Sequence, residues 1–421
     1  MRVDRPERAR RRLGAPAWWF VAGYGVSAVG TGLCYPFLAI YLSQFRGLST
    51  GATALLLLVL AGAAVPMSVV GGWLVDRYSP RVVAIAALLV QAVGWLLVSV
   101  GSGYAAELAA VLVIGVGTGS FLPAVVPIIT VLSATDEVKV RTMSLRYLLL
   151  NLGLGVGAGL GGVLLGSASA TTYQWLCAAN AISCAAYALI IAVRVPLPRA
   201  EDDAAEHRAR LVRFRPGLNY ALLLVAQLLL VTFGLAQVES GVPLMVRTEL
   251  SGSTALIGGL YAVATAVVLI GQLPVSRWVE RVHKTRALIT MGLVWAAAWL
   301  LGYTAGALTG GPRVALLFVM MVTFALGECA YSPAFYTLVE RIAPKGTLGR
   351  SSGAAWAVFQ VGNTIGPPIA VFLVGGNVPF WLVLATAAVA AAVLVLIVDR
   401  RMHTTPDASS SNRFARLAAD G

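Results

Sequence analysis

The chain has 421 residues, of which 58% are hydrophobic and 12% are charged, and its formal net charge is +13. A soluble domain carries about 25% charged residues, so this composition excludes an ordinary soluble protein. The hydrophobic residues form runs of about 20 or more, a length that crosses ~30 Å of hydrocarbon as a helix. The short alternating segments of a membrane β-barrel do not occur.

Twelve membrane-spanning helices are therefore expected, in an all-α integral membrane protein. In chain order the expected spans are 17–42, 51–75, 82–101, 105–131, 144–166, 172–194, 218–245, 254–275, 286–307, 314–339, 351–374 and 378–398. The polar, charged linker 195–217 divides them into two six-helix bundles, 17–194 and 218–398. A basic arm, 1–16, precedes the bundles. A tail, 399–421, follows them and is expected to be disordered.

The positive charges fall on alternate loops. Of the 31 Lys and Arg residues, all except Arg46, Arg247 and Arg313 belong to the termini, the linker or the loops on the same side. The positive-inside rule then places both termini in the cytoplasm, and the positive charge lies against anionic lipid, with no nucleic-acid partner implied. This interpretation puts Arg146 in the loop before the fifth span and Glu107 at the outer surface. The Arg- and Ala-rich composition suggests a bacterial inner membrane.

A short charged hinge joins the second and third spans. It runs from Gly71 to Val82 with a turn expected at Ser79-Pro80, and it contains the pattern Gly-x-Leu-x-Asp-Arg-x-x-x-Arg. This pattern resembles the loop motif of the major facilitator superfamily. The resemblance implies that the acidic residue caps and pairs across the cytoplasmic helix ends, which latches the outward-open state. The gating residues of the motif are Gly72, Asp76, Arg77 and Arg81.

The second half of the chain repeats features of the first. Val279-Glu280-Arg281 follows the eighth span as Val75-Asp76-Arg77 follows the second, which adds Glu280 and Arg281 to the expected gate. Further repeated pairs in the same order are Gly117 with Gly327, Pro123 with Pro333, Arg141 with Arg350, Asn151 with Gln360, and Gly157 with Gly366. Two such six-helix repeats around a central site are typical of secondary transporters. We therefore expect the pseudo-symmetric major facilitator fold.

Glycines recur at four-residue spacing in the fifth span, at Gly153, Gly157 and Gly161, and the eleventh span contains Gly366-Pro367. Such spacing lets another helix backbone approach closely. The pattern is similar to a motif of the drug:proton antiporter branch, although Ala158 stands where that motif has proline. The resemblance implies efflux of hydrophobic, neutral or cationic small molecules, hence multidrug resistance.

Glu239 and Glu328 are the two ionisable residues expected well inside the spans, each costing roughly 2.5–3.5 kcal/mol at mid-helix. Hydrocarbon favours the neutral form of a carboxyl group, so either could take up a proton or bind a cation. No basic residue is expected nearby, and Val111 occupies the position of the Arg that many proton-coupled relatives have in the fourth span. The expected coupling and substrate residues are Glu328, Glu239, Asn151, Gln360 and Tyr331. A purely structural role for the acids is the alternative.

The expected function is proton-coupled export by alternating access, by a monomer with a small-molecule substrate, the proton gradient as its energy source, and no cofactor or metal. Two alternatives remain open: an importer or uncoupled facilitator of a metabolite, and a non-transporting membrane sensor or enzyme. No nucleophile–base pair or phosphate-binding loop supports an enzyme.

Overall fold

A computed structural model describes residues 13–165, 169–196, 214, 216–250, 253–344, 346–375 and 379–404. Most of the basic arm, most of the linker and most of the tail lie outside these residues. The described part of the chain contains 12 helices that are long and apolar enough to cross a membrane. The prediction of twelve spans is confirmed.

The N-terminal half begins with α2 (Ala15–Cys34), which continues through the short irregular segments η1 (Tyr35–Phe37), α3 (Leu38–Ile40) and η2 (Tyr41–Phe45). Its other helices are α4 (Thr50–Arg77), α5 (Pro80–Val100), α6 (Tyr104–Leu132), α7 (Asp136–Leu165) and α8 (Ala170–Arg194). The C-terminal half begins with α10 (Leu218–Leu230), η3 (Val231–Leu235), α11 (Ala236–Glu239) and α12 (Gly241–Thr248). It continues with α13 (Thr254–Arg281), α14 (Lys284–Gly306), α15 (Gly310–Ile342), α16 (Leu348–Gly375) and α17 (Phe380–Thr404).

The two halves pack by the same plan. Helix pairs α5–α6, α4–α6, α5–α8 and α2–α8 of the first half correspond to α14–α15, α13–α15, α14–α17 and α10–α17 of the second. Between the halves, α4 packs on α16 as α13 packs on α7, and α7 packs on α15 as α16 packs on α6. This correspondence confirms the predicted pseudo-symmetric fold of two six-helix halves.

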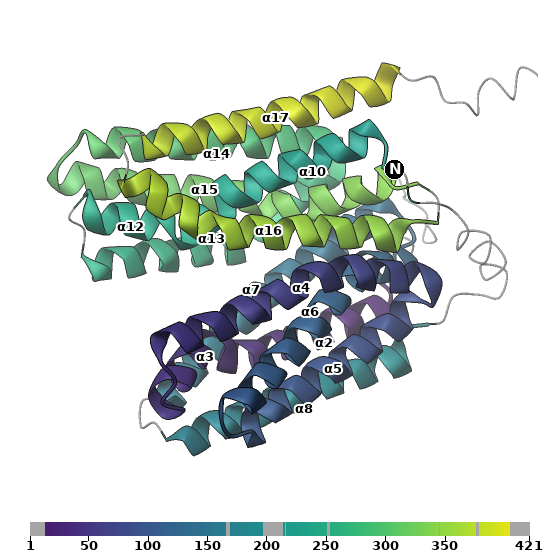
Figure 1. Ribbon diagram of the computed structural model, residues 1–421. Helices are drawn as coiled ribbons and strands as arrows, with labels where there is room; N and C mark the ends of the chain where they lie inside the picture. The colour runs from purple at the N-terminus through teal and green to yellow at the C-terminus, as the bar shows by residue number, and fades with distance from the viewer. Residues whose placement is uncertain are drawn as a thin grey trace, which may run out of the picture.

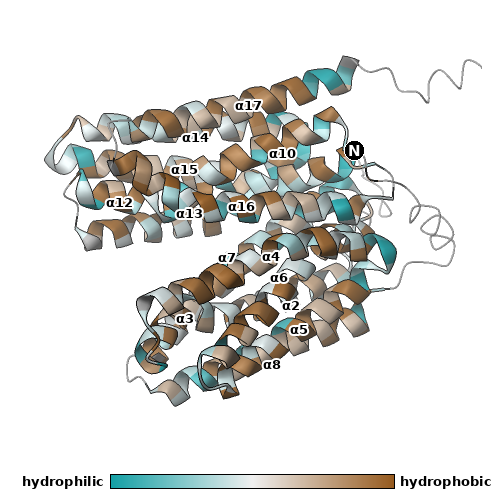
Figure 2. Cartoon of the chain, in the orientation of Figure 1, coloured by the Kyte–Doolittle hydropathy of each residue, from teal (hydrophilic) through white to brown (hydrophobic). Residues whose placement is uncertain are grey.

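We call the end of the molecule where α4 gives way to α5 the hinge end. Ser79 begins α5 by accepting a hydrogen bond from the Arg81 N–H at 3.3 Å, as the predicted turn requires. The bundles lie close together at this end, where both described chain ends also lie, and they diverge toward the opposite end (Figure 1). Hydrophilic residues gather at the hinge end, and hydrophobic residues cover the helices between the two ends (Figure 2).

The fifth span begins earlier than its hydrophobic run suggests. Helix α7 starts at Asp136, whereas the sequence predicted a span from residue 144. The added turns are polar, so hydropathy alone does not reveal them. Arg146 falls within the predicted span 144–166 and lies inside helix α7, where it is only 2% exposed. Its assignment to a loop was wrong, and so was the expectation that the spans hold no basic residue.

The seventh span is broken at the end far from the hinge. A π-helical turn, η3, follows α10, and the backbone leaves helical geometry at Ser240. The Gln237 side chain donates to the Thr232 carbonyl at 2.9 Å and to the Gly366 carbonyl of α16 at 3.0 Å. It therefore satisfies backbone groups that a regular helix would pair internally. Glu239 ends α11 at this break with its side chain exposed.

The predicted glycine stripe packs α7 against α2. A Cβ atom added to Gly157 would overlap the Val29 carbonyl oxygen, and one added to Gly153 would lie 2.7 Å from the Gly25 carbonyl oxygen. Gly155, on another face of α7, has nothing within 4 Å of such an atom. The stripe therefore serves close helix contact.

We expect Gly157→Ala to destabilise the protein by about 1–3 kcal/mol through overpacking of the α2–α7 contact. The matched variant Gly155→Ala should leave stability unchanged or raise it slightly, because alanine favours helix more than glycine. Thermal unfolding of the detergent-solubilised protein measures both. Equal melting temperatures for the two variants would contradict this role of the stripe.

Candidate functional site

Asp76 joins the two halves at the hinge end. Its Oδ1 accepts a hydrogen bond from the Gly349 N–H at 2.6 Å. Its Oδ2 accepts from the Arg350 N–H at 3.1 Å and from the Arg350 Nε–H at 2.7 Å. The carboxylate therefore caps the first turn of α16, where the helix dipole favours negative charge, and also forms an ion pair. Of the other motif residues, Gly72 allows α4 to touch the Gly349 backbone.

The basic residues of the hinge motif contact residues of the N-terminal half, to which they belong. Arg77 is exposed, and its guanidinium lies 5.2 Å from the centre of the Trp73 ring and 5.8 Å from that of Tyr78. Arg81 donates a hydrogen bond to the Ala192 carbonyl of α8. The predicted repeat partners do not contact Asp76: Glu280 lies within electrostatic range of Arg141, and Arg281 is exposed.

A second set of ion pairs closes the hinge end between α7 and α15. Lys139 of α7 pairs with Glu340 of α15, and Asp136 of α7 pairs with Arg341 of α15. The Lys139 and Glu340 side chains are 9% and 18% exposed, whereas Asp136 and Arg341 are 40% and 47% exposed. The first pair is therefore better shielded from solvent and salt, and contributes more to closing this end.

This polar contact between α7 and α15 continues toward the middle of the membrane. Arg146 Nη2 of α7 donates to Ser332 Oγ of α15 at 3.3 Å, and Tyr147 donates through its hydroxyl group to Glu328 Oε1. On α15 the side chains involved are spaced four residues apart and so share one helix face. We call the face formed by Glu328, Ser332, Tyr336 and Glu340 the α15 polar stripe.

Glu328 thus connects the halves directly. Its half-buried side chain faces α7 rather than the interior of its own bundle. Asn151, one turn further along α7, donates to the Tyr147 carbonyl at 2.9 Å. Leu150 and Leu154 of the same helix line a cavity. The acid, its tyrosine partner and Asn151 therefore form one polar group next to the cavity wall.

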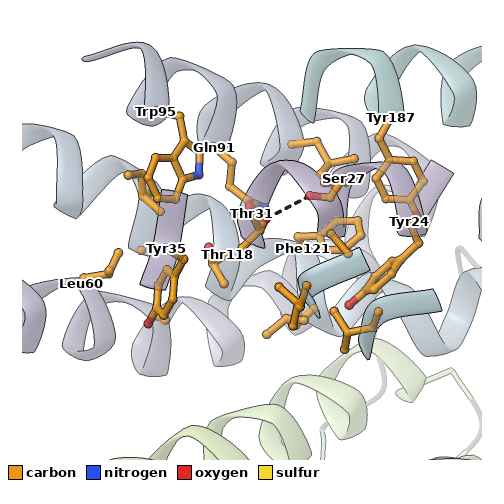
Figure 3. Close-up of a pocket in the computed structure, with 18 of the residues that line it drawn as sticks. Tyr24, Ser27, Thr31, Tyr35, Leu60, Gln91, Trp95, Thr118, Phe121 and Tyr187 are labelled. Carbon is orange, nitrogen blue, oxygen red and sulfur yellow. Dashed lines mark hydrogen bonds between the residues drawn. The ribbon is translucent and has the colours of Figure 1, made fainter. Parts of the chain in front are cut away.

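The cavity lies mainly within the N-terminal half and has a volume of about 330 Å³. Its polar groups are uncharged hydroxyls and amides, including those of Thr31, Gln91 and Thr118 (Figure 3). Aromatic and aliphatic side chains supply the rest of the wall. Gln360 of α16 is the lining residue that comes from the described part of the C-terminal half. Such a lining suits hydrophobic molecules that carry few hydrogen-bonding groups.

Two other predicted site residues are not among those that line this cavity. Tyr331 is buried in the C-terminal half, where it accepts a hydrogen bond from Gln227 Nε2 at 3.1 Å and stacks on Phe335. Glu239 lies at the far end of the seventh span, and its charge reaches Tyr35 of the other half. The structure therefore links Glu328 and Asn151 through Tyr147 and places Gln360 in the cavity wall. Tyr331 is buried in the C-terminal half, and Glu239 lies within electrostatic range of Tyr35 and Glu328.

Glu107 corrects another expectation. It is 1% exposed rather than on the surface, and its Oε1 lies 2.9 Å from Arg46 Nε. Arg46 also donates to the Gly101 carbonyl and lies over the Tyr41 ring. This pair fastens the segment after the first span to α6 inside the N-terminal half.

Sequence reasoning missed Arg146, Tyr147 and Arg350. Two signals were present in the chain. Arg350 is the repeat counterpart of Arg141, which marks it as a gate residue. The four-residue spacing of the α15 polar stripe places its polar side chains on one helix face, which is expected to pack against polar groups of another helix.

The family comparison agrees with this architecture. The chain matches the family model described as Major Facilitator Superfamily over residues 20–353, with a further match over 240–418. The chain belongs to the Major Facilitator Superfamily and is a multi-pass membrane transporter of that family.

Its relatives in sequence are distant but cover nearly the whole chain. It is 25% identical to the "Uncharacterized MFS-type transporter YqjV" of Bacillus subtilis over 380 residues, covering 87% of this chain and 88% of the relative. It is also 25% identical to the "Multidrug resistance protein MdtH" of Aeromonas hydrophila over 411 residues, covering 93% of this chain and 96% of the relative.

Solved structures share the fold at lower identity. The fucose:proton symporter FucP of E. coli matches with a TM-score of 0.72 and 17% identity, covering 91% of this chain and 98% of FucP. A bacterial homologue of the iron transporter ferroportin, in an outward-facing state, matches with a TM-score of 0.74 and 13% identity, covering 92% of this chain and 100% of the homologue.

Proposed function

We propose that the protein is a proton-coupled exporter of hydrophobic, neutral or cationic small molecules in a bacterial inner membrane. The observation that carries the proposal is the Tyr147–Glu328 hydrogen bond, which joins the two halves one helical turn from the cavity wall. A carboxyl group in this position has a protonation state that is sensitive to how the halves meet. Proton binding and the movement of the halves are therefore linked.

The hinge end faces the cytoplasm in this proposal, as the positive-inside rule predicts. The described conformation, closed at the hinge end, is then outward-open. Protonation of Glu328 from outside accompanies release of the substrate, and the bundles 17–194 and 218–398 rock to open the hinge end. Substrate binding from the cytoplasm accompanies loss of the proton. Asp76 with Arg350, and Lys139 with Glu340, must separate and re-form in each cycle.

The substrate class follows from the cavity. Its polar lining groups are neutral, so a charged group placed there would lose hydration without a counter-ion. An apolar molecule with few hydrogen-bonding groups fits best, and a cation can use the nearby Glu328 carboxyl. Distant kinship with relatives named for multidrug resistance points the same way.

Drug susceptibility in an efflux-deficient bacterium tests this proposal. Cells that express the chain should tolerate higher concentrations of several lipophilic compounds and accumulate less ethidium than cells with an empty vector. The uptake alternative predicts unchanged drug tolerance together with accumulation of a labelled sugar or amino acid, and that result would overturn export.

A further inference from the structure

Arg146 is a permanent positive charge in the membrane-spanning part of α7, with no carboxylate bound to it. Arginine side chains carry a positive charge in proteins. None of the ion pairs among the described residues includes Arg146. Its Nε is buried and has no hydrogen-bond partner. A buried cation in this state is energetically expensive unless a counter-charge becomes available.

The present partners of Arg146 are neutral. Nη1 donates to the Tyr24 hydroxyl at 2.9 Å, and the guanidinium carbon lies 5.0 Å from the centre of the Tyr24 ring. Nη2 donates to Ser332 at 3.3 Å, which is long for a hydrogen bond of this kind. Around them lie Tyr187 of α8 and Tyr336 of α15, both within electrostatic range of the guanidinium. These contacts hold Arg146 without neutralising it.

Glu328 is the carboxyl group placed to neutralise it. Ser332 and Glu328 lie on the same face of α15, one turn and about 6 Å apart along the helix axis. Tyr147, the residue after Arg146, already bonds Glu328. Helix α2, which packs against α7 and supplies Tyr24, contains no acidic residue. On the other neighbours of α7, Glu280 of α13 acts on Arg141, and Glu340 of α15 is paired with Lys139.

We propose that Arg146 is the counter-charge of ionised Glu328 and is therefore a positioning residue for proton coupling. The inference rests on proton exchange at Glu328, as proposed above. When the O–H bond of Glu328 breaks, the proton passes to water on the side to which the protein is open. The Arg146 guanidinium then leaves Ser332 and pairs with the new carboxylate one turn away. When Glu328 is protonated again, Arg146 returns to Ser332.

The movement of Arg146 between Ser332 and Glu328 also links the proton site to the substrate cavity. Tyr24 is one of the residues that line the cavity (Figure 3). Its hydroxyl also accepts the hydrogen bond from Arg146. A substrate that displaces Tyr24 removes one neutral partner of Arg146 and so favours its pairing with Glu328. Substrate binding and proton release are thereby coupled through one side chain, without a basic residue in the fourth span.

A double-mutant cycle on stability tests the pairing without any transport assay. We expect Arg146→Gln and Glu328→Gln, each measured at about pH 9, to lower the apparent melting temperature of the purified protein. The double variant should melt no lower than the less stable single variant. At about pH 5 the proposal requires a neutral Glu328. The effects of the two single variants on the melting temperature should then add. Arg146→Lys, which keeps the charge, should preserve the coupling at high pH.

The other charged or titratable groups that act on Glu328 are Tyr147, Cys329 and Glu239. Tyr147→Phe therefore serves as the control, because it removes the neutral partner and should leave the Arg146–Glu328 coupling in place. Additive effects at both pH values would overturn the proposal. Failure of drug export with an intact stability coupling would instead overturn the proposed function alone.

Infrared difference spectra of wild-type protein with isotope-labelled arginine provide a second test, whose readout does not depend on stability. The carboxylic-acid band that Glu328→Gln abolishes should disappear on raising the pH, together with a shift of a guanidinium band. Arg146→Lys should remove the guanidinium shift. A carboxylic-acid band that disappears without any arginine change would overturn the proposal.

Discussion

We expect Glu328→Gln to abolish export driven by a pH gradient while leaving substrate exchange across the membrane intact. Glutamine preserves the size of the side chain and a hydrogen-bonding partner for Tyr147, but it cannot bind or release a proton. One proton exchanged for one neutral substrate molecule can sustain about a tenfold substrate gradient per pH unit. In the variant this ratio should fall to about one.

Proteoliposomes loaded with a lipophilic substrate provide the measurement. Wild-type protein should move substrate against its gradient when a pH difference is imposed, and Glu328→Gln should only equilibrate it. Gly155→Ala in the same vesicles is a useful control, because Gly155 lies on another face of α7 and an added Cβ atom there has nothing within 4 Å. Undiminished gradient-driven transport by Glu328→Gln would remove Glu328 from the mechanism.

We expect Asp76→Asn to open the hinge end. The substitution removes the negative charge from the first turn of α16 and leaves one acceptor oxygen where three hydrogen bonds now meet. Hydrogen bonds to a charged group contribute about 1.5–3 kcal/mol each. Losing the equivalent of one such bond shifts the balance between closed and open states by roughly tenfold or more.

Ser68→Cys provides a reporter of that opening. Ser68 is fully buried where α4 meets Gly353 of α16, so a cysteine there is protected while the halves are in contact. Membrane-impermeant maleimide, applied from the hinge side, should label it much faster when Asp76→Asn is also present. The four native cysteines are buried and contribute little background.

Arg77→Gln is the matched control for this experiment. Arg77 is the motif neighbour of Asp76, but its guanidinium lies over the Trp73 and Tyr78 rings of its own half. Its loss should leave the Ser68→Cys reporter protected. Equal labelling in both variants would mean that Asp76 does not hold the hinge end closed.

How far the sequence predicts this molecule depends on the physical signal in question. Hydropathy located all twelve spans, because crossing a bilayer requires long apolar helices whatever their neighbours. Hydropathy also placed the start of α7 too late in the chain, because polar turns that extend beyond the membrane carry no hydropathy signal. The loop assignment of Arg146 had another cause: it was counted with the charges of the neighbouring loop although it falls within the predicted span 144–166.

The cavity was harder to predict than the helices. In a membrane, both the lipid-facing and the core-facing sides of a helix are apolar, so periodicity does not separate them. Gln227, Gln237 and Gln272 are polar residues of the spans that do not line the cavity, and each donates a hydrogen bond within the C-terminal half. Thr31, Gln91 and Thr118, which do line it, resemble ordinary helix residues in the sequence.

The gate was predicted in part. The motif around Asp76 indicated a residue that pairs across helix ends, but its partner Arg350 lies far away in the chain and is brought near only by the packing of α4 on α16. Spacing along a sequence cannot reveal a partner in another element. The internal repeat matches Arg350 with Arg141 and Asp76 with Glu280, but it does not show which acid each arginine meets.

Proton movement in vesicles that contain a pH-sensitive dye tests the central claim most directly. The vesicles have no imposed pH gradient, and a lipophilic substrate is added outside. The account predicts that substrate entering the vesicles drives protons out, so the interior becomes more alkaline with wild-type protein and does not change with Glu328→Gln. Substrate uptake with no change in internal pH, or with acidification, would contradict proton-coupled export.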